Sequence, residues 1–127
     1  MRILKKLFRR KTAPAAVIPP WEEIVEHLQG KQLTFYDETV VRVITSKDRS
    51  KRILITKSEN GFFKAIYEEI RVSDEEEWTY FCNDKCNRYP AWWEPVSATI
   101  NTTSFYGTEE EAMHCAFESI EYRTYFA

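Results

Sequence analysis

The chain contains few of the residues that break, bend or cross-link a backbone. Only three of its 127 residues are glycines, five are prolines and three are cysteines. Three scattered glycines cannot form a phosphate-binding loop or a dinucleotide fingerprint, because both motifs need several glycines at fixed spacing. The low glycine and proline content also excludes a collagen-like or low-complexity chain. Hydrophobic residues make up 43% of the sequence, which is typical of one globular domain with its own core.

Long apolar runs are absent as well. No stretch approaches the roughly 18 residues of a membrane-spanning helix, and the first residues lack the apolar run of a secretory signal. The cysteines Cys82, Cys86 and Cys115 cannot all pair within one chain, which fits free thiols in a reducing compartment. We therefore expect a cytoplasmic protein.

Charge is unevenly distributed: the net charge is −2, yet the first eleven residues carry six cations and no acid. Removing these six from the 18 cations leaves 12 against 20 acidic residues, so residues 12–127 carry −8. Leu4, Leu7 and Phe8 recur at helical spacing between the cations, which predicts a basic amphipathic tail over residues 1–11. Such a tail suits an anionic surface such as the inner face of a membrane, and the alternative is a solvated terminus. Its candidate contact residues are Arg2, Lys5, Lys6, Arg9, Arg10 and Lys11.

A linker and a helix follow this tail. Residues 12–20 contain three prolines, which forbid a continuous helix there. Apolar residues then recur at helical spacing over residues 21–29, and Gly30 supplies an end to that helix. We expect residues 21–127 to form a single domain.

From residue 32 onward, β-branched and aromatic residues alternate with polar ones, which predicts strands. Asn60-Gly61 is the dipeptide favoured in a type I′ hairpin turn, and strands joined by such short turns run antiparallel. The acidic residues 73–77 read as a further turn. We expect about five or six strands, at residues 33–36, 40–45, 52–56, 62–72, 78–82 and 96–100.

The last helix has the clearest local signals. Thr108 and Glu111 have the spacing of a capping box, and an apolar stripe through Met113 and Phe117 predicts a helix over residues 109–121. The chain is therefore predicted to be an α+β domain, with both terminal helices on one face of an antiparallel sheet. The predicted core contains Trp21, Ile24, Leu28, Val41, Val43, Ile53, Ile55, Ile66, Met113, Phe117 and Ile120.

Catalytic and metal-binding patterns are weak. Cys82 and Cys86 are four residues apart, and His114-Cys115 offers two more zinc ligands, but neighbouring helical residues point about 100° apart and seldom bind one ion. Both histidines lie on the flanks of predicted helices, away from any nucleophile. We expect no catalytic residue, no metal site and no cofactor. The alternative is an enzyme or small-ligand binder with a pocket near Cys82, Cys86 and His114.

Nucleic acid is a disfavoured partner. A basic turn contains Lys47, Arg49, Lys51 and Arg52, but the −8 charge of the remaining chain opposes phosphate binding. Association through the basic tail alone is the alternative.

Acidic and aromatic residues occur together in the second half of the chain. Tryptophan and tyrosine anchor many protein interfaces, and acidic side chains around them suit a basic protein partner. The alternative is that the indoles face the core and the acids are simply solvated. The candidate partner-binding residues are Glu68, Glu69, Glu75, Glu76, Trp92, Trp93 and Glu94.

This layout resembles that of the small cytoplasmic immunity proteins that protect bacteria from polymorphic or contact-dependent toxins. The resemblance rests on the first helix, the antiparallel sheet rich in acids and aromatics, and the last helix opened by residues 105–112 (FYGTEEEA). It covers residues 21–127 at the level of architecture and assigns no residue. It implies a non-enzymatic inhibitor that occludes a toxin domain by complementary charge and shape.

Overall fold

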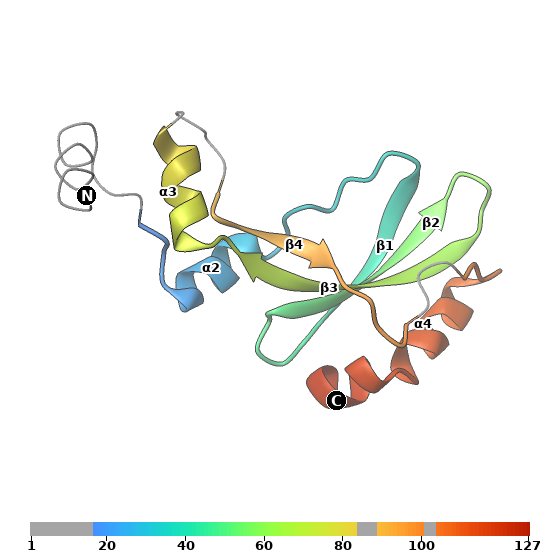
Figure 1. Cartoon of the computed structure of the whole chain (residues 1–127). Coiled ribbons are helices and arrows are strands. Elements are labelled where there is room, and N and C mark those ends of the chain that lie inside the picture. The colour runs from blue at the N-terminus through green and yellow to red at the C-terminus, as the bar shows by residue number, and fades with distance from the viewer. Residues whose placement is uncertain (1–16, 84–88, 101–103) are drawn as a thin grey trace, which may run out of the picture.

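The computed structural model of the chain describes residues 17–83, 89–100 and 104–127. The predicted tail, most of the predicted linker and Cys86 lie outside these residues. Four strands form one antiparallel sheet in the order in which they occur along the chain (Figure 1). They are β1 (Glu38–Thr45), β2 (Lys51–Ser58), β3 (Phe63–Val72) and β4 (Ala91–Pro95). The helices are α2 (Trp21–Leu28), α3 (Glu75–Asn83), α4 (Glu109–Phe117) and the π-helical turn η1 (Tyr122–Phe126).

The α+β class and the antiparallel sheet are therefore confirmed, but the expected number of strands is wrong for the described residues. Residues 33–36 form no strand; Thr34 makes only an isolated bridge to Thr39. The last strand is β4 rather than residues 96–100, so Pro95 ends it instead of beginning it. A proline has no N–H to give to a ladder, which suits either end of an edge strand.

The segment predicted as an acidic turn and a strand at residues 78–82 is helix α3. The carboxylate of Asp74 accepts hydrogen bonds from the backbone N–H groups of Glu76 and Glu77, which caps the start of the helix. The glutamates of the first turn also complement the helix dipole. This capping outweighs the β-propensity of the aromatic residues that follow.

The turn between β2 and β3 is a hairpin turn of a different type from the one expected. Gly61 has a φ of +87°, but Asn60 is not in the left-handed region that a type I′ turn requires at both central residues. The N–H of Gly61 bonds to the carbonyl of Ser58, whose own N–H bonds to the carbonyl of Phe62. This pattern is that of a short turn followed by a left-handed glycine, which only glycine adopts without strain.

The two helices that flank the sheet in sequence contact opposite faces of it. Ile53 and Ile55 of β2 pair with Tyr67 and Ala65 of β3, and these four pack against α4; we call this the α4 face. Ile70 of β3 pairs with Trp93 of β4, and both pack against α2. Because side chains alternate along β3, Ile70 points away from the α4 face, onto what we call the α2 face. The prediction that both helices cover one face is therefore wrong.

Helix α4 is turned by about one residue from the predicted orientation. Ala112, Ala116 and Ser119 are buried, whereas Phe117 and Ile120 are exposed and Met113 lies at the flank. Small side chains let the helix approach the sheet closely, so the larger residues lie beside the contact.

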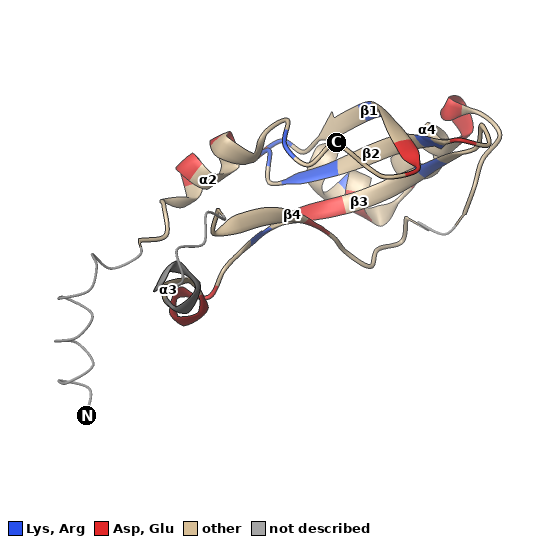
Figure 2. Cartoon of the chain, turned by 90° about the horizontal axis from the view of Figure 1, so that it is seen from above, with Lys and Arg blue, Asp and Glu red and all other residues tan. Residues whose placement is uncertain are grey.

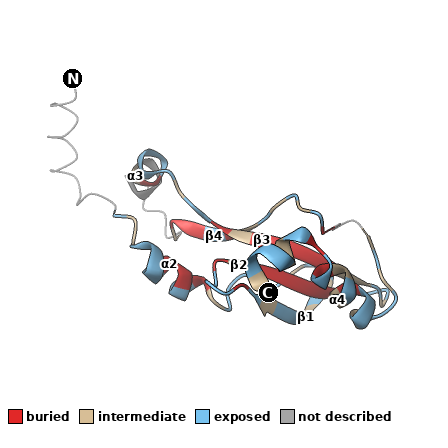
Figure 3. Ribbon diagram, turned by 90° about the horizontal axis from the view of Figure 1, so that it is seen from below, coloured by how far each residue is buried: buried red, intermediate tan, exposed pale blue. Residues whose placement is uncertain are grey.

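Of the predicted core, Ile24, Leu28, Ile53, Ile55 and Ile66 are buried, while Trp21, Val41 and Val43 are exposed (Figure 3).

Candidate functional site

The α2 face contains a buried ion pair between neighbouring strands. The guanidinium of Arg52 is only 2% exposed and its Nε donates to Oε1 of Glu68 at 2.8 Å. Its two remaining nitrogens donate to the backbone carbonyls of Lys31 at 2.8 Å and Gln32 at 3.0 Å. Burial lowers the pKa of Arg52 and the bond to Glu68 opposes that effect. All three guanidinium nitrogens have acceptors, which is the condition for burying such a charge.

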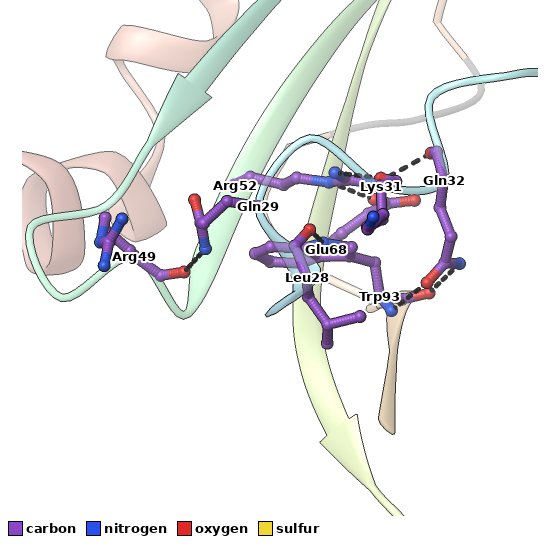
Figure 4. Close-up of polar contacts among 8 residues, drawn as sticks. All are labelled: Leu28, Gln29, Lys31, Gln32, Arg49, Arg52, Glu68 and Trp93. Atoms are coloured by element: carbon purple, nitrogen blue, oxygen red, sulfur yellow. Dashed lines mark hydrogen bonds and ion pairs between the residues drawn. The ribbon is translucent and has the colours of Figure 1, made fainter. Parts of the chain in front are cut away.

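Trp93 completes this network. Its indole ring stacks against Arg52, with the guanidinium carbon 4.3 Å from the ring centre. Its Nε1 donates to the carbonyl of Leu28 at 2.7 Å, so the side chain also ties β4 to the end of α2. The amide of Gln32 bonds both backbone groups of Trp93, accepting from its N–H and donating to its carbonyl. Figure 4 shows how these side chains converge between the segment that follows α2 and strands β2, β3 and β4.

Two predicted partner-binding residues are therefore misplaced. Glu68 and Trp93 are each only 3% exposed, so neither offers a surface to a partner. Residue type alone points to both as interface residues, but the sequence pattern does not reveal which neighbour of an adjacent pair faces the core. Arg52, predicted as part of a basic turn, is buried in the same network, and Arg49 pairs with Glu26.

The other predicted strand residues lie on the opposite side of the β3–β4 pair. Trp92 pairs with Arg71 across the strands, Glu94 pairs with Glu69, and all four side chains point away from α2. The Trp92 indole is 37% exposed and donates to Glu94 at 3.1 Å. Glu94 also forms an ion pair with Arg71 at 3.2 Å. Glu69 accepts a hydrogen bond from the hydroxyl of Tyr67 at 2.7 Å, and burial together with this bond raises the pKa of Tyr67.

Helix α3 adds its acidic first turn to this side. Glu75 and Glu76 are exposed, and neither forms an ion pair among the described residues. Figures 2 and 3 show α3 and α2 on opposite sides of the β3–β4 pair, so α3 lies toward the side that carries Trp92. The structure therefore brings five predicted residues to what we call the acidic side: Glu69, Glu75, Glu76, Trp92 and Glu94.

A second acidic and aromatic surface was missed in the sequence. It surrounds a hollow of about 540 Å³ at the β2–β3 turn, with Phe62 and Phe105 exposed on its walls and the acids Asp37, Glu38 and Glu59 around them. These residues come from three separate segments, so no spacing in the sequence connects them. Phe62 and Phe105, aromatic residues next to turns, are the features of the sequence that could have indicated this surface.

The third surface is a groove of about 990 Å³ along α4, with His114, Cys115 and Ile120 among its lining residues. His114 is exposed and its Nε2 lies 3.2 Å from the Glu118 carboxylate. A hydrogen bond with Cys115 raises the pKa of Tyr106 at the groove wall. The described residues do not bring together the alternative pocket near Cys82, Cys86 and His114. Helix α3, which carries Cys82, lies at the opposite end of the sheet from α4, which carries His114 (Figure 1), and Cys86 lies outside the described residues.

The part of the chain that the structure describes holds neither a metal-binding cluster nor a membrane-spanning helix. No group of three or more His, Cys, Asp or Glu side chains there is placed to hold a metal ion. None of the helices there combines the length and the apolar character needed to cross a bilayer.

Comparison with protein-family models, with curated proteins and with solved structures found no match.

Proposed function

We propose that the protein is a non-enzymatic binding module that inhibits a basic protein partner, in the manner of an immunity protein, through its acidic side. Support comes chiefly from the exposed Trp92 indole, which lies on the same side as the acidic first turn of α3. An indole gives a large apolar contact once desolvated, and carboxylates around it attract a basic surface.

Strand β4 is well suited to present this indole. The backbone of Trp93 is clamped by Gln32, and its side chain is locked between Arg52 and Leu28. Because side chains alternate along the strand, fixing Trp93 inward fixes Trp92 outward. A contact surface that is rigid before binding loses less conformational entropy on association, which favours affinity.

The charge arrangement separates two roles. Arg71 neutralises Glu94 and orients it toward the Trp92 indole, whereas Glu75 and Glu76 pair with no cation among the residues that the structure describes. We expect the α3 acids to speed the encounter with a basic partner and the indole to hold the complex.

The experiment is a quantitative capture from native lysate with four tagged forms of the protein. These are the unmodified protein, Trp92→Ala, Glu75→Lys with Glu76→Lys, and Trp21→Ala. Trp21 is a matched control, because it is also a partly exposed tryptophan (45%) but belongs to α2. A basic protein should be captured by the unmodified and Trp21→Ala forms and lost from the other two.

Binding kinetics with the captured partner then test the division of roles. Trp92→Ala should raise the dissociation rate, by an amount worth about 2 kcal/mol if it is a hot spot. The Lys variant should slow association and flatten its salt dependence. Equal capture by all four forms, or a partner that is acidic, would contradict the proposal.

A further inference from the structure

The hollow at the β2–β3 turn has features that the acidic side lacks. Its aromatic walls are well exposed: Phe62 by 50% and Phe105 by 59%, while Tyr36, next to the lining residue Asp37, is 97% exposed. Large apolar side chains exposed around one hollow are typical of a surface that another segment covers.

The acids at the hollow are only partly neutralised. Glu38 pairs with Lys64 at 2.8 Å, but Asp37 and Glu59 form no ion pair with any other described residue. The Lys64 ammonium also lies 5.8 Å from the centre of the Phe105 ring. The structure thus already holds one cation between a carboxylate and an aromatic ring here, and it leaves acceptors for more.

We propose that the basic segment at residues 1–11 of the same chain docks in this hollow. This segment supplies six cations and no acid, which complements Asp37 and Glu59. Its apolar residues Leu4, Leu7 and Phe8 would cover the aromatic walls. The hollow and the acidic side share no residue, so this inference does not depend on the proposed function.

The segment is long enough to reach. Ile18 packs against the cluster that contains Ile70, and the hollow lies at the other end of β3, beside Phe62. The eight residues from Phe62 to Ile70 span about 26 Å of strand. The ten residues from Phe8 to Ile18 span about 33–36 Å when extended. Tethering within one chain also gives the segment a high effective concentration at the hollow.

Carbodiimide cross-linking of the full chain tests this docking, because the reagent joins lysine amines to carboxylates that are in contact. Mass spectrometry of the monomer band should find Lys5, Lys6 or Lys11 linked to Asp37 or Glu59. The Lys64–Glu38 ion pair supplies an internal reference link. High salt should reduce the tail links, because dissolved ions weaken the attraction between exposed charges.

A double variant, Phe62→Ala with Phe105→Ala, separates docking from simple charge attraction. Loss of the aromatic walls should lower the yield of tail links by about fivefold or more relative to the reference link. Trp92→Ala, which changes an aromatic residue on the acidic side, should leave the yield unchanged. Unaltered melting of both variants would show that folding is intact.

Four results would overturn the proposal: tail links only to the acids of α3, tail links only in a dimer band, a reference link without tail links, or a yield that the double variant leaves unchanged. If the double variant unfolds, Asp37→Asn with Glu59→Gln in the full chain replaces it. Weaker docking is then read from chemical modification of the tail lysines, which should become faster.

Discussion

The two faces of the sheet are stabilised in different ways. On the α4 face, the buried cluster consists of small, aliphatic and aromatic side chains, among them Ala112, Ala116 and Ile53. On the α2 face, a charged pair, an indole and a glutamine side chain are joined by hydrogen bonds. One core is therefore stabilised mainly by apolar packing, and the other also depends on hydrogen bonds and a buried ion pair.

These two cores should fail differently. A close-packed apolar contact is sensitive to larger side chains, because no space remains for extra atoms. A buried polar network tolerates replacement of both partners by apolar side chains of similar shape. It does not tolerate removal of one partner, since an unpaired buried charge is costly.

The largest effect is expected from Glu68→Ala. It leaves the Arg52 guanidinium buried without its carboxylate, which should cost about 3–5 kcal/mol in the free energy of unfolding, measured with urea. Glu94→Ala is the matched control, because it breaks the exposed ion pair to Arg71 and should cost at most about 1 kcal/mol. The double variant Arg52→Met with Glu68→Leu should recover most of the loss. Equal costs for Glu68→Ala and Glu94→Ala would remove the contrast between the faces.

On the α4 face, Ala116→Leu should destabilise by overpacking. Ala116 is fully buried against the sheet, so added methyl groups should cost about 1–3 kcal/mol. Phe117→Ala on the neighbouring position should cost less than the ~3–5 kcal/mol of a fully buried phenylalanine, because its side chain is 39% exposed. Chemical denaturation of both variants checks the orientation of α4. A full cost of ~3–5 kcal/mol for Phe117→Ala, with no loss of stability in Ala116→Leu, would place Phe117 in the core.

The clamp on β4 should have a smaller effect. Gln32→Ala removes both hydrogen bonds to the backbone of Trp93 and should cost about 1–2 kcal/mol. Gln29→Ala is a matched change in the same segment, and its bonds go to the carbonyls of Val25 and Arg49 rather than to β4. We expect hydrogen exchange of β4 amides to become faster in Gln32→Ala only. Faster exchange in both variants would show that the segment acts as a whole.

The smallest effect is expected at the turn between β1 and β2. The Arg49 carbonyl of this turn accepts a hydrogen bond from the Gln29 side chain, and its Lys47 N–H donates to the carbonyl of Tyr125. Chiefly the backbone N–H of Ser50, with the Ser46 and Ser50 hydroxyls, holds the pKa of Asp48 below its usual 3.8. A carboxylate with a lowered folded-state pKa stabilises above its unfolded value and loses that contribution as the pH falls through the lowered one. The stability difference between the protein and Asp48→Asn should therefore shrink below about pH 4. A constant difference down to about pH 3 would contradict this linkage.

Local signals in the sequence were reliable where both partners lie within one turn of helix. The Thr108–Glu111 capping box forms with both of its hydrogen bonds, and α2 ends just before Gly30 as expected. Asp74 belongs to the same class of signal, but its capping role was missed because the residues after it favour strands. Asp74 followed by Glu75, Glu76 and Glu77 is also the pattern of a capped helix start, and on that interpretation it predicts α3.

The positions of the predicted partner-binding residues could be inferred only in part from local sequence signals. Five of the seven predicted partner-binding residues lie on one side of the molecule, but Glu68 and Trp93 do not. Adjacent residues in a strand face opposite ways, so the choice between Trp92 and Trp93 depends on which face α2 covers.

Residues close together in the chain are enough to predict the α+β class, the antiparallel order of the strands and the capping box of the last helix. Three other features could be seen only in the folded protein: α2 and α4 take opposite faces, Arg52 is buried on Trp93, and Phe62 and Phe105 meet at one hollow. Each of these depends on contacts between distant segments, and their energies arise only when the sheet has brought those segments together.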